Sequence, residues 1–387
     1  MKAGREVAVA GVGYSTVSRN GSLGVEQLAV TACHNALADA GLAGRDVDGL
    51  FAYSFGFDSP DCHYVQQALA IPDLAAYADI GAMGPSGLGG ALAGVMAVSS
   101  SGCETALVFR AITQAAGGTG SFRGGGGAPM GAMGASLEMT VPFGYAPIIP
   151  AIAMMMQRRI DELGGAIEDY GHIAINARRW AAMNERAVMR EPISMDDYLT
   201  SRILAEPLRL LDCDYPVSGA CAAVLTTAER ARDLRRPPVL VDAFAYASGL
   251  RADWIQGEDF MFGATRRCAD RLWSRASVTA RDVDVAELYD GFTHITISWL
   301  EALGFCGIGE AGAFIDEGRR IGPGGELPLN THGGQLAAGR LHGLAHLVEA
   351  VSQLRGEGGE RQVPGARVAV VTNGHGPQCG ALVLRAE

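Results

Sequence analysis

The feature that most constrains the fold is an internal repeat of strand and helix patterns. In each copy an apolar run precedes a helical pattern, an Arg-Asp-Val-Asp turn, a second apolar run, a glycine-opened helix and a third apolar run. Such a duplicated unit predicts an α/β protein whose sheets are covered by helices on both faces. The first copy comprises residues 7–10, 23–41, 45–48, 84–98 and 106–109, and the second comprises 239–244, 264–274, 281–284, 285–289, 333–354 and 368–371.

The segment between the two copies does not repeat. Its four consecutive glycines at 124–127 indicate a flexible loop, and its three methionines at 154–156 indicate a core or interface helix. We expect this segment to form a loop domain over an active site. The predicted division is an N-terminal half at 1–114 with part of 210–235, an insert at 115–209 and a C-terminal half at 236–387.

Composition excludes several classes of function. The 387 residues carry a formal net charge of -11 with no basic cluster, which argues against nucleic acid as the ligand. No signal pattern is visible at the N-terminus, and the longest apolar stretch, at 148–156, is too short to span a bilayer. The eight cysteines form no CxxC pair. These features predict a cytoplasmic protein with reduced thiols and no membrane segment.

Several common motifs are incomplete. Residues 84–90 are rich in glycine but lack the dinucleotide-binding spacing, no Walker lysine follows, and no G-x-S-x-G elbow occurs. His342 and His346 are spaced i, i+4, as metal ligands on one helix face would be, but no third ligand is evident. We therefore expect no metal site, and we expect His346 to be a core histidine.

The repeat, together with four short motifs, resembles the thiolase superfamily over nearly the whole chain. The resemblance is strongest to its lipid-transfer (sterol-carrier) branch. It implies a thiolase fold: a duplicated, five-layered αβαβα core with an inserted loop domain. The motifs are ELYDGF at 287–292, LEALGFC at 300–306, NTHGG at 330–334, and LDC at 211–213 with AERAR at 228–232.

The catalytic positions of thiolases are changed in this chain. Thiolases place a nucleophilic cysteine in the turn that matches Gly84–Gly87 here, and this turn has no cysteine. Arg340 stands where thiolases have the histidine of their Gly-His-Pro motif, and the second thiolase cysteine corresponds to Thr372. Covalent acyl transfer needs a thiolate. The chain is therefore not expected to perform thiolase chemistry by the usual cysteine route.

The same branch includes steroid side-chain-cleaving aldolases that also lack the thiolase cysteine. The resemblance thus implies retro-aldol cleavage of a β-hydroxyacyl-CoA, in which a base removes the hydroxyl proton and the thioester enolate is held and reprotonated. It further implies coenzyme A as part of the substrate with no other cofactor, a homodimer, and a small partner protein with a zinc ribbon and an OB fold.

Two groups of side chains are candidates for this chemistry, each with an ordinary structural alternative such as a core contact, helix cap or salt bridge. A tyrosine or histidine can exchange protons if its environment suits, and Asp290 can orient its neighbours or cap a helix. Arg340 can stabilise an enolate oxygen or a phosphate. The catalytic candidates are Tyr289, His332, His342, His375 and Asp290, and the substrate-binding candidates are Tyr246, Arg340, Gly84, Ser86 and Gly334.

Two other functions remain open at this stage. A non-catalytic acyl-CoA or lipid carrier, or a scaffold subunit, would use the same pocket without an acid or base. A condensing enzyme would need a displaced cysteine nucleophile, for example Cys103 or Cys379.

Overall fold

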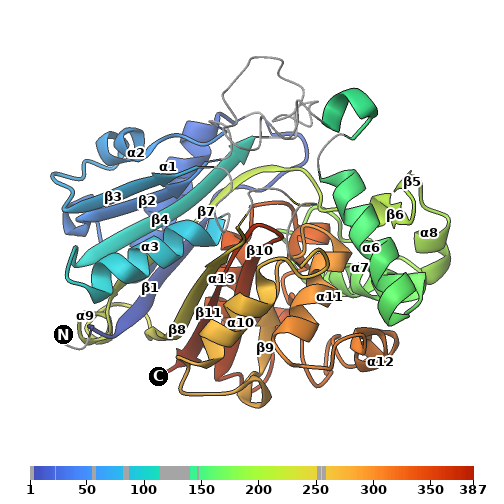
Figure 1. The fold of residues 1–387 in the computed structure, drawn as a ribbon. Helices are drawn as coiled ribbons and strands as arrows, with labels where there is room; N and C mark the ends of the chain where they lie inside the picture. The colour runs from blue at the N-terminus through green and yellow to red at the C-terminus, as the bar shows by residue number, and fades with distance from the viewer. Residues whose placement is uncertain are drawn as a thin grey trace.

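The computed structural model describes residues 4–21, 23–54, 58–81, 87–113, 140–145, 148–250, 254 and 259–387 (Figure 1). Gly84 and Ser86, like the four glycines at 124–127, lie outside these ranges. The strands are β1 (Val7–Tyr14), β2 (Gly49–Tyr53), β3 (Ala76–Ile80), β4 (Thr105–Thr113), β5 (Ile203–Ala205), β6 (Leu208–Arg209), β7 (Ser218–Thr227), β8 (Val239–Ser248), β9 (Val285–Glu287), β10 (Val368–His375) and β11 (Gln378–Ala386). The α-helices are α1 (Val25–Ala40), α2 (Cys62–Ala68), α3 (Gly87–Ser99), α6 (Ile149–Leu163), α7 (Ile167–Ala182), α8 (Met195–Leu199), α9 (Ala228–Arg232), α10 (Thr265–Trp273), α11 (Thr293–Ala302), α12 (Ala311–Ile315) and α13 (Leu344–Leu354).

The described strands confirm the repeat predicted from the sequence. One nine-stranded sheet has the order β3-β2-β4-β7-β1-β8-β11-β10-β9. Read from its outer edge, the first copy is β3-β2-β4-β7-β1 and the second is β9-β10-β11-β8. A parallel bridge between Ala286 and Leu329 beside β9 occupies the place that β3 has beside β2. The copies join where β1 pairs with β8.

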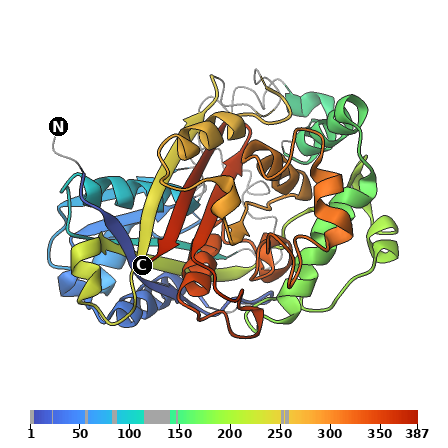
Figure 2. The same cartoon turned by 90° about the horizontal axis from the view of Figure 1, so that it is seen from below.

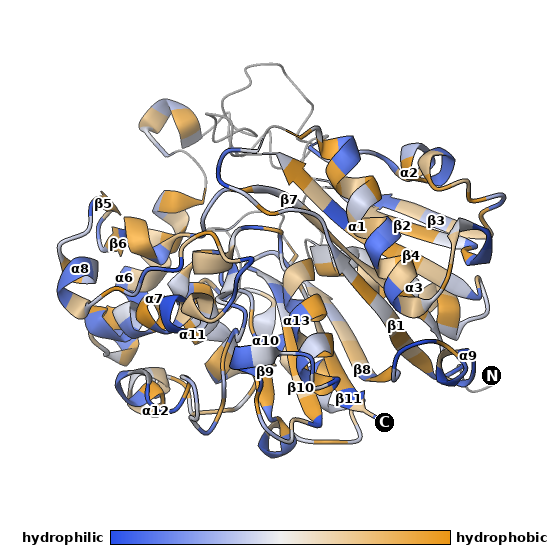
Figure 3. Cartoon of the chain, turned by 180° about the vertical axis from the view of Figure 1, so that it is seen from behind, coloured by the Kyte–Doolittle hydropathy of each residue, from blue (hydrophilic) through white to orange (hydrophobic). Residues whose placement is uncertain are grey.

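Helices cover both halves of the sheet and give five layers. Helix α1 packs on β1, β4 and β7, whereas α10 packs on β8 and β11. Helices α3 and α13 touch each other between the two halves, and their apolar side chains share one buried core. The strands are mainly apolar along their length, as expected for a sheet buried on both faces (Figure 3). The architecture is the α/β thiolase-type core that the sequence predicts.

Close approach of α1 to the sheet depends on a glycine. A Cβ atom at Gly13 of β1 would lie 2.3 Å from the backbone nitrogen of Ala36, so only glycine lets the helix lie directly on the strand. The helix ends at Gly41, whose φ of 75° gives the left-handed cap that glycine adopts without strain.

The described part of the insert packs against the C-terminal half. Side chains of α6 and α7 belong to the same buried core as those of α10, α11 and β11. Seen from below, β10 and β11 lie between the N-terminal half and these helices (Figure 2).

The single helix expected over residues 333–354 is wrong. One π-helical turn, Gly334–Ala338, is separated from α13 by a bend at residues 339–343. Gly339 and Gly343 both have positive φ, and a Cβ at Gly343 would lie 2.0 Å from Nδ2 of Asn373. Asn373 of β10 packs against this bend and donates from Nδ2 to the carbonyl of His342, so Gly343 leaves no room for a larger side chain.

No helix in the described ranges is both long and apolar enough to cross a membrane.

Candidate active site

The candidate site lies where β9 and β10 end and the two central helices begin. These two strands are parallel, so their carboxyl ends meet at one edge of the sheet, where α/β folds commonly bind ligands. The backbone carbonyl of His342, in the bend before α13, accepts hydrogen bonds from Gly87 N of α3 (2.7 Å) and Asn373 Nδ2 of β10 (2.6 Å). The first residue of α3, the end of β10 and the bend therefore converge at one point.

Tyr289 follows β9 and is 9% exposed. Its backbone N–H donates to Thr372 Oγ1 at 3.0 Å, which places the residue beside the position of the second thiolase cysteine. Burial, with the nearby charge of Asp214, raises the pKa of the Tyr289 phenol well above its ordinary value. The phenol is consequently protonated at neutral pH, which suits Tyr289 to donate a proton in the free protein.

Asp214 is the acidic group that the sequence analysis missed. Burial raises the pKa of Asp214 to about 6, despite the opposing effect of Arg340. Arg340 Nη1 lies 3.2 Å from Asp214 Oδ1. A carboxylate with such a pKa is suited to general base catalysis near neutral pH. Asp214 directly follows the LDC segment at 211–213, but nothing in that segment shows that residue 214 would lie beside Tyr289.

Arg340 is thus neither an isolated surface residue nor an unpaired cation. Its side chain is 24% exposed and pairs with Asp214. Its backbone N–H donates to the carbonyl of Tyr215 at 2.9 Å, which fixes the bend against the segment that contains Asp214.

Asp290 orients its neighbours and does not cap the helix that follows it. Helix α11 has Phe292 at its N-cap, with no side-chain hydrogen bond there. The buried Asp290 carboxylate instead accepts from the backbone N–H groups of Gln335 (2.9 Å) and Leu336 (3.3 Å). A Cβ at Gly334 would lie 1.8 Å from Asp290 Oδ2, so the predicted Gly334 is needed for this close approach.

His346 and His332 form a second, fully buried group with Glu287. His346 Nε2 lies 3.1 Å from Asp290 Oδ1, and His332 Nδ1 lies 3.0 Å from Glu287 Oε2. Burial alone would lower the pKa of His332, but Glu287 and two further carboxylates raise it above its usual value. His346 is buried as expected, but it is part of a polar cluster and not simply an apolar core contact.

His342 does not share a helix face with His346. It precedes α13 with a φ of 52° and points instead toward Arg110 of β4. Arg110 Nε lies 3.2 Å from His342 Nδ1, and because a guanidinium only donates, Nδ1 must be the unprotonated ring nitrogen. Burial and the two nearby arginines lower the pKa of His342 well below its usual value, so the ring is neutral with its proton on Nε2.

His375 lies in a different group from His332. Its ring stacks near Trp254 and meets His294 of α11 edge-on at 5.8 Å. Burial lowers the pKa of His375 to about 4. A neutral histidine in these surroundings is a packing and hydrogen-bonding group in the free protein.

Tyr246 lies apart from these groups, on β8. It is 41% exposed, and its backbone carbonyl accepts from Arg271. Among the described residues no hydrogen bond, ion pair or ring contact joins it to Tyr289 or to the histidines.

Neither Cys103 nor Cys379 has the properties of a nucleophilic cysteine. Burial raises the pKa of the Cys103 thiol to about 12, and that of Cys379 even further above its usual value. Reactive cysteines have lowered pKa values and access to solvent. Neither thiol that the sequence analysis considered therefore suits covalent catalysis.

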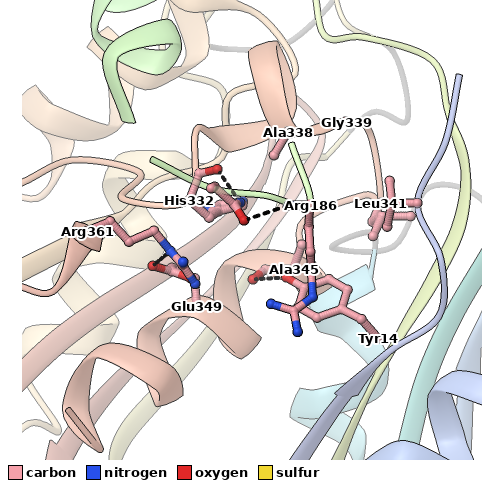
Figure 4. Close-up of a pocket in the computed structure, with 11 residues that line it drawn as sticks. Tyr14, Arg186, His332, Ala338, Gly339, Leu341, Ala345, Glu349 and Arg361 are labelled. Carbon is pink, nitrogen blue, oxygen red and sulfur yellow. Dashed lines mark hydrogen bonds and ion pairs between the residues drawn. The ribbon is translucent and has the colours of Figure 1, made fainter. Parts of the chain in front are cut away.

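A small pocket lies beside the buried histidines (Figure 4). His332, Tyr14, Glu349 and Arg361 are among the residues that line it, and Arg361 contacts the Glu349 carboxylate at 2.9 and 3.0 Å. Tyr14 donates to the carbonyl of Ala345 at 3.3 Å. The pocket has both polar and apolar walls and is small enough to suit water molecules, not an acyl chain.

Comparison with known proteins supplies the context for this site. A family model described as thiolase C-terminal domain-like matches residues 251–384. The chain is 35% identical to a steroid side-chain-cleaving aldolase of Thermomonospora curvata over 386 residues, covering 98% of both chains. It is 34% identical to a 17-hydroxy-3-oxo-4-pregnene-20-carboxyl-CoA lyase of Mycobacterium tuberculosis, covering 98% of this chain and 99% of the relative. The solved structure of an Ltp2-ChsH2(DUF35) aldolase superposes with a TM-score of 0.90 at 33% identity, over 100% of this chain and 99% of that one.

Proposed function

This chain belongs to the thiolase-fold family of steroid side-chain-cleaving aldolases, and from this premise we propose its substrate. The substrate is a β-hydroxyacyl-CoA whose acyl group is a steroid side chain. The chain is an acyl-CoA carbon–carbon lyase of the aldolase type. The substrate class follows the relatives whose names include a steroid side chain and a pregnene carboxyl-CoA. A cysteine-free reaction is supported by a protonated Tyr289 whose backbone contacts Thr372, the position of the second thiolase cysteine, and by Asp214, whose charge raises the pKa of the Tyr289 phenol.

In the proposed reaction Asp214 accepts the proton of the β-hydroxyl group. The Cα–Cβ bond then breaks, the former hydroxyl carbon becomes a ketone, and the bonding electrons pass into the thioester as an enolate. Tyr289 donates its proton to Cα, which yields the shorter acyl-CoA, and the proton on Asp214 returns to the Tyr289 phenolate. The neutral His342, with its proton on Nε2, is a suitable hydrogen-bond donor to the enolate oxygen.

We also propose that the protein works in the cytoplasm as a homodimer joined by a small partner with a zinc ribbon and an OB fold. The name of the solved relative, Ltp2-ChsH2(DUF35) aldolase, joins two proteins and supports the presence of such a partner.

Replacement of Tyr289 by Phe tests the proposal. We expect kcat for cleavage of a branched β-hydroxyacyl-CoA to fall about 10²–10⁴-fold, because the proton donor is lost while the ring still fills its space. Mass spectrometry of the ketone and the shorter acyl-CoA, in the presence of the partner protein, measures this. Tyr64→Phe, at a tyrosine that is 46% exposed, is the matched control and should leave kcat unchanged. Full turnover by Tyr289→Phe would contradict the assignment.

A further inference from the structure

Three buried side chains outside the proposed reaction converge on one point. Ligand-capable atoms of Glu287, His332 and His346 all lie within 4.8 Å of one another. Their residues are at most 3% exposed. They come from β9, from the turn at 330–333 and from α13, three segments that are far apart in the sequence.

Several polar atoms in this cluster lack hydrogen-bond partners. Glu287 Oε2, both ring nitrogens of His332 and Nδ1 of His346 are buried and unsatisfied. His332 Nδ1 and Glu287 Oε2 approach to 3.0 Å, but without the alignment of a hydrogen bond. A bound ion is one way to satisfy buried polar atoms that lie this close together without partners.

The outer atoms of the same side chains are held firmly. Glu287 Oε1 accepts from the backbone N–H and the hydroxyl of Thr331, both at 2.9 Å. His346 Nε2 lies 3.1 Å from Asp290, whose carboxylate is fixed by two backbone N–H groups. A histidine that donates one ring N–H to a carboxylate and directs the other nitrogen inward is the usual arrangement around a protein-bound metal.

The charge of the cluster is compatible with a bound cation. Glu349 pairs with Arg361, whereas the ion-pair contacts of Glu287 and Asp290 within the described ranges are with histidines. Two histidine protons or one divalent cation could neutralise them. Two protons would place charged rings 4.8 Å apart, each with a buried N–H that lacks an acceptor, whereas a divalent cation would use the nitrogen lone pairs.

We propose that Glu287, His332 and His346 bind a divalent transition-metal ion, with Zn²⁺ as the first choice. Imidazole and carboxylate donors suit zinc, and three protein ligands with one water would give the ion its four-coordinate geometry. The ion would join the segment that leads into Tyr289 to α13 and the 330–333 turn. The fourth ligand would be a water from the pocket that His332 borders. This inference does not depend on the aldolase reaction.

The sequence analysis expected no metal because it considered His342 with His346. The structure turns His342 away toward Arg110 and supplies His332 and Glu287 in its place.

Metal analysis of the full-length chain, purified without a histidine tag from zinc-supplemented cells, tests the proposal. We expect about one zinc per chain by mass spectrometry of the elements, and at least about tenfold weaker zinc binding in Glu287→Gln and in His346→Gln. His294→Gln, which changes another fully buried histidine of the same core region, is the control and should keep the ion. A chelator should lower the Tm of the wild type but not that of Glu287→Gln.

Two results would overturn the site. One is a wild-type chain that folds without metal and takes up none from added Zn²⁺, which would leave a protonated His332–Glu287 pair. The other is full zinc content in both variants. If the variants do not fold, X-ray absorption at the zinc edge of the wild type decides: nitrogen and oxygen ligands support the site, whereas sulfur ligands overturn it.

Discussion

The two central helices occupy equivalent places in the repeat but have opposite characters. Helix α3 has no charged residue, and its side chains pack the space between the halves. Helix α13 packs against it with one apolar face but also buries His346, Glu349 and Gln353. Duplication of a stable unit allows one copy to keep a packing helix while the other supports chemistry. The polar residues on α13 are tolerated because Asp290, Arg361 and Thr331 contact them.

The N-terminal half also brings a buried cation to the site. Arg110 of β4 is 0% exposed and makes two contacts with Asp58, at 2.7 and 2.6 Å, besides its contact with His342. Both halves therefore contribute buried polar residues, and they differ in how many. Substitutions in each half measure this difference.

Replacement of Arg110 by Met should have the largest effect on stability. It leaves the Asp58 carboxylate without its buried partner, and breaking such a pair costs about 3–5 kcal/mol. Denaturant unfolding measures the loss. Arg5→Met removes an exposed pair with Glu104 and should cost less than about 1 kcal/mol. Equal effects at the two sites would show that Arg110 has no special place in the N-terminal half.

Matched truncations in the two central helices come next. Leu88 of α3 and Leu347 of α13 are both 0% exposed in the shared core, and Leu→Ala should cost about 2–5 kcal/mol at each. Only Leu347→Ala should also lower kcat, because α13 supports the bend at 339–343, which pairs Arg340 with Asp214 and places His342. A decrease in kcat of the same size for Leu88→Ala would remove the functional difference between the helices.

Asp214→Asn should change the pH profile more than the fold. Asp214 has a pKa of about 6 and must be ionised to accept a proton, so wild-type kcat/KM should fall as the pH drops through about 6. The variant should lose this acidic limb and be about 10²–10⁴-fold slower above it. Asp73→Asn, at an exposed loop position, should retain the wild-type profile. If Asp214→Asn kept the acidic limb of the pH profile, that limb would arise from the titration of another group.

Tyr246→Phe should have the smallest effect. The side chain is 41% exposed, so we expect a change below about 0.5 kcal/mol in stability and little change in kcat. A large loss of activity would place Tyr246 in the substrate site after all.

Much of the fold could be predicted from local patterns. The strands at 7–10, 106–109, 239–244 and 368–371 and the helices at 23–41 and 264–274 are all present with small shifts at their ends. Apolar periodicity is a local property that the sequence displays directly. The bend at 339–343 could not be predicted in this way, because it packs against a side chain distant in the sequence, Asn373, whose amide donates to the His342 carbonyl.

The sequence by itself determined the repeat, the α/β class and the absence of a cysteine at the thiolase nucleophile position. Each of these follows from which residue stands where along the chain. Only the tertiary structure decided which polar residues meet: Asp214 with Tyr289, Arg110 with His342, and Glu287 with His332 and His346. Partners brought together by folding set the charge, the burial and hence the protonation of each group, and none of these is a property of the residue alone.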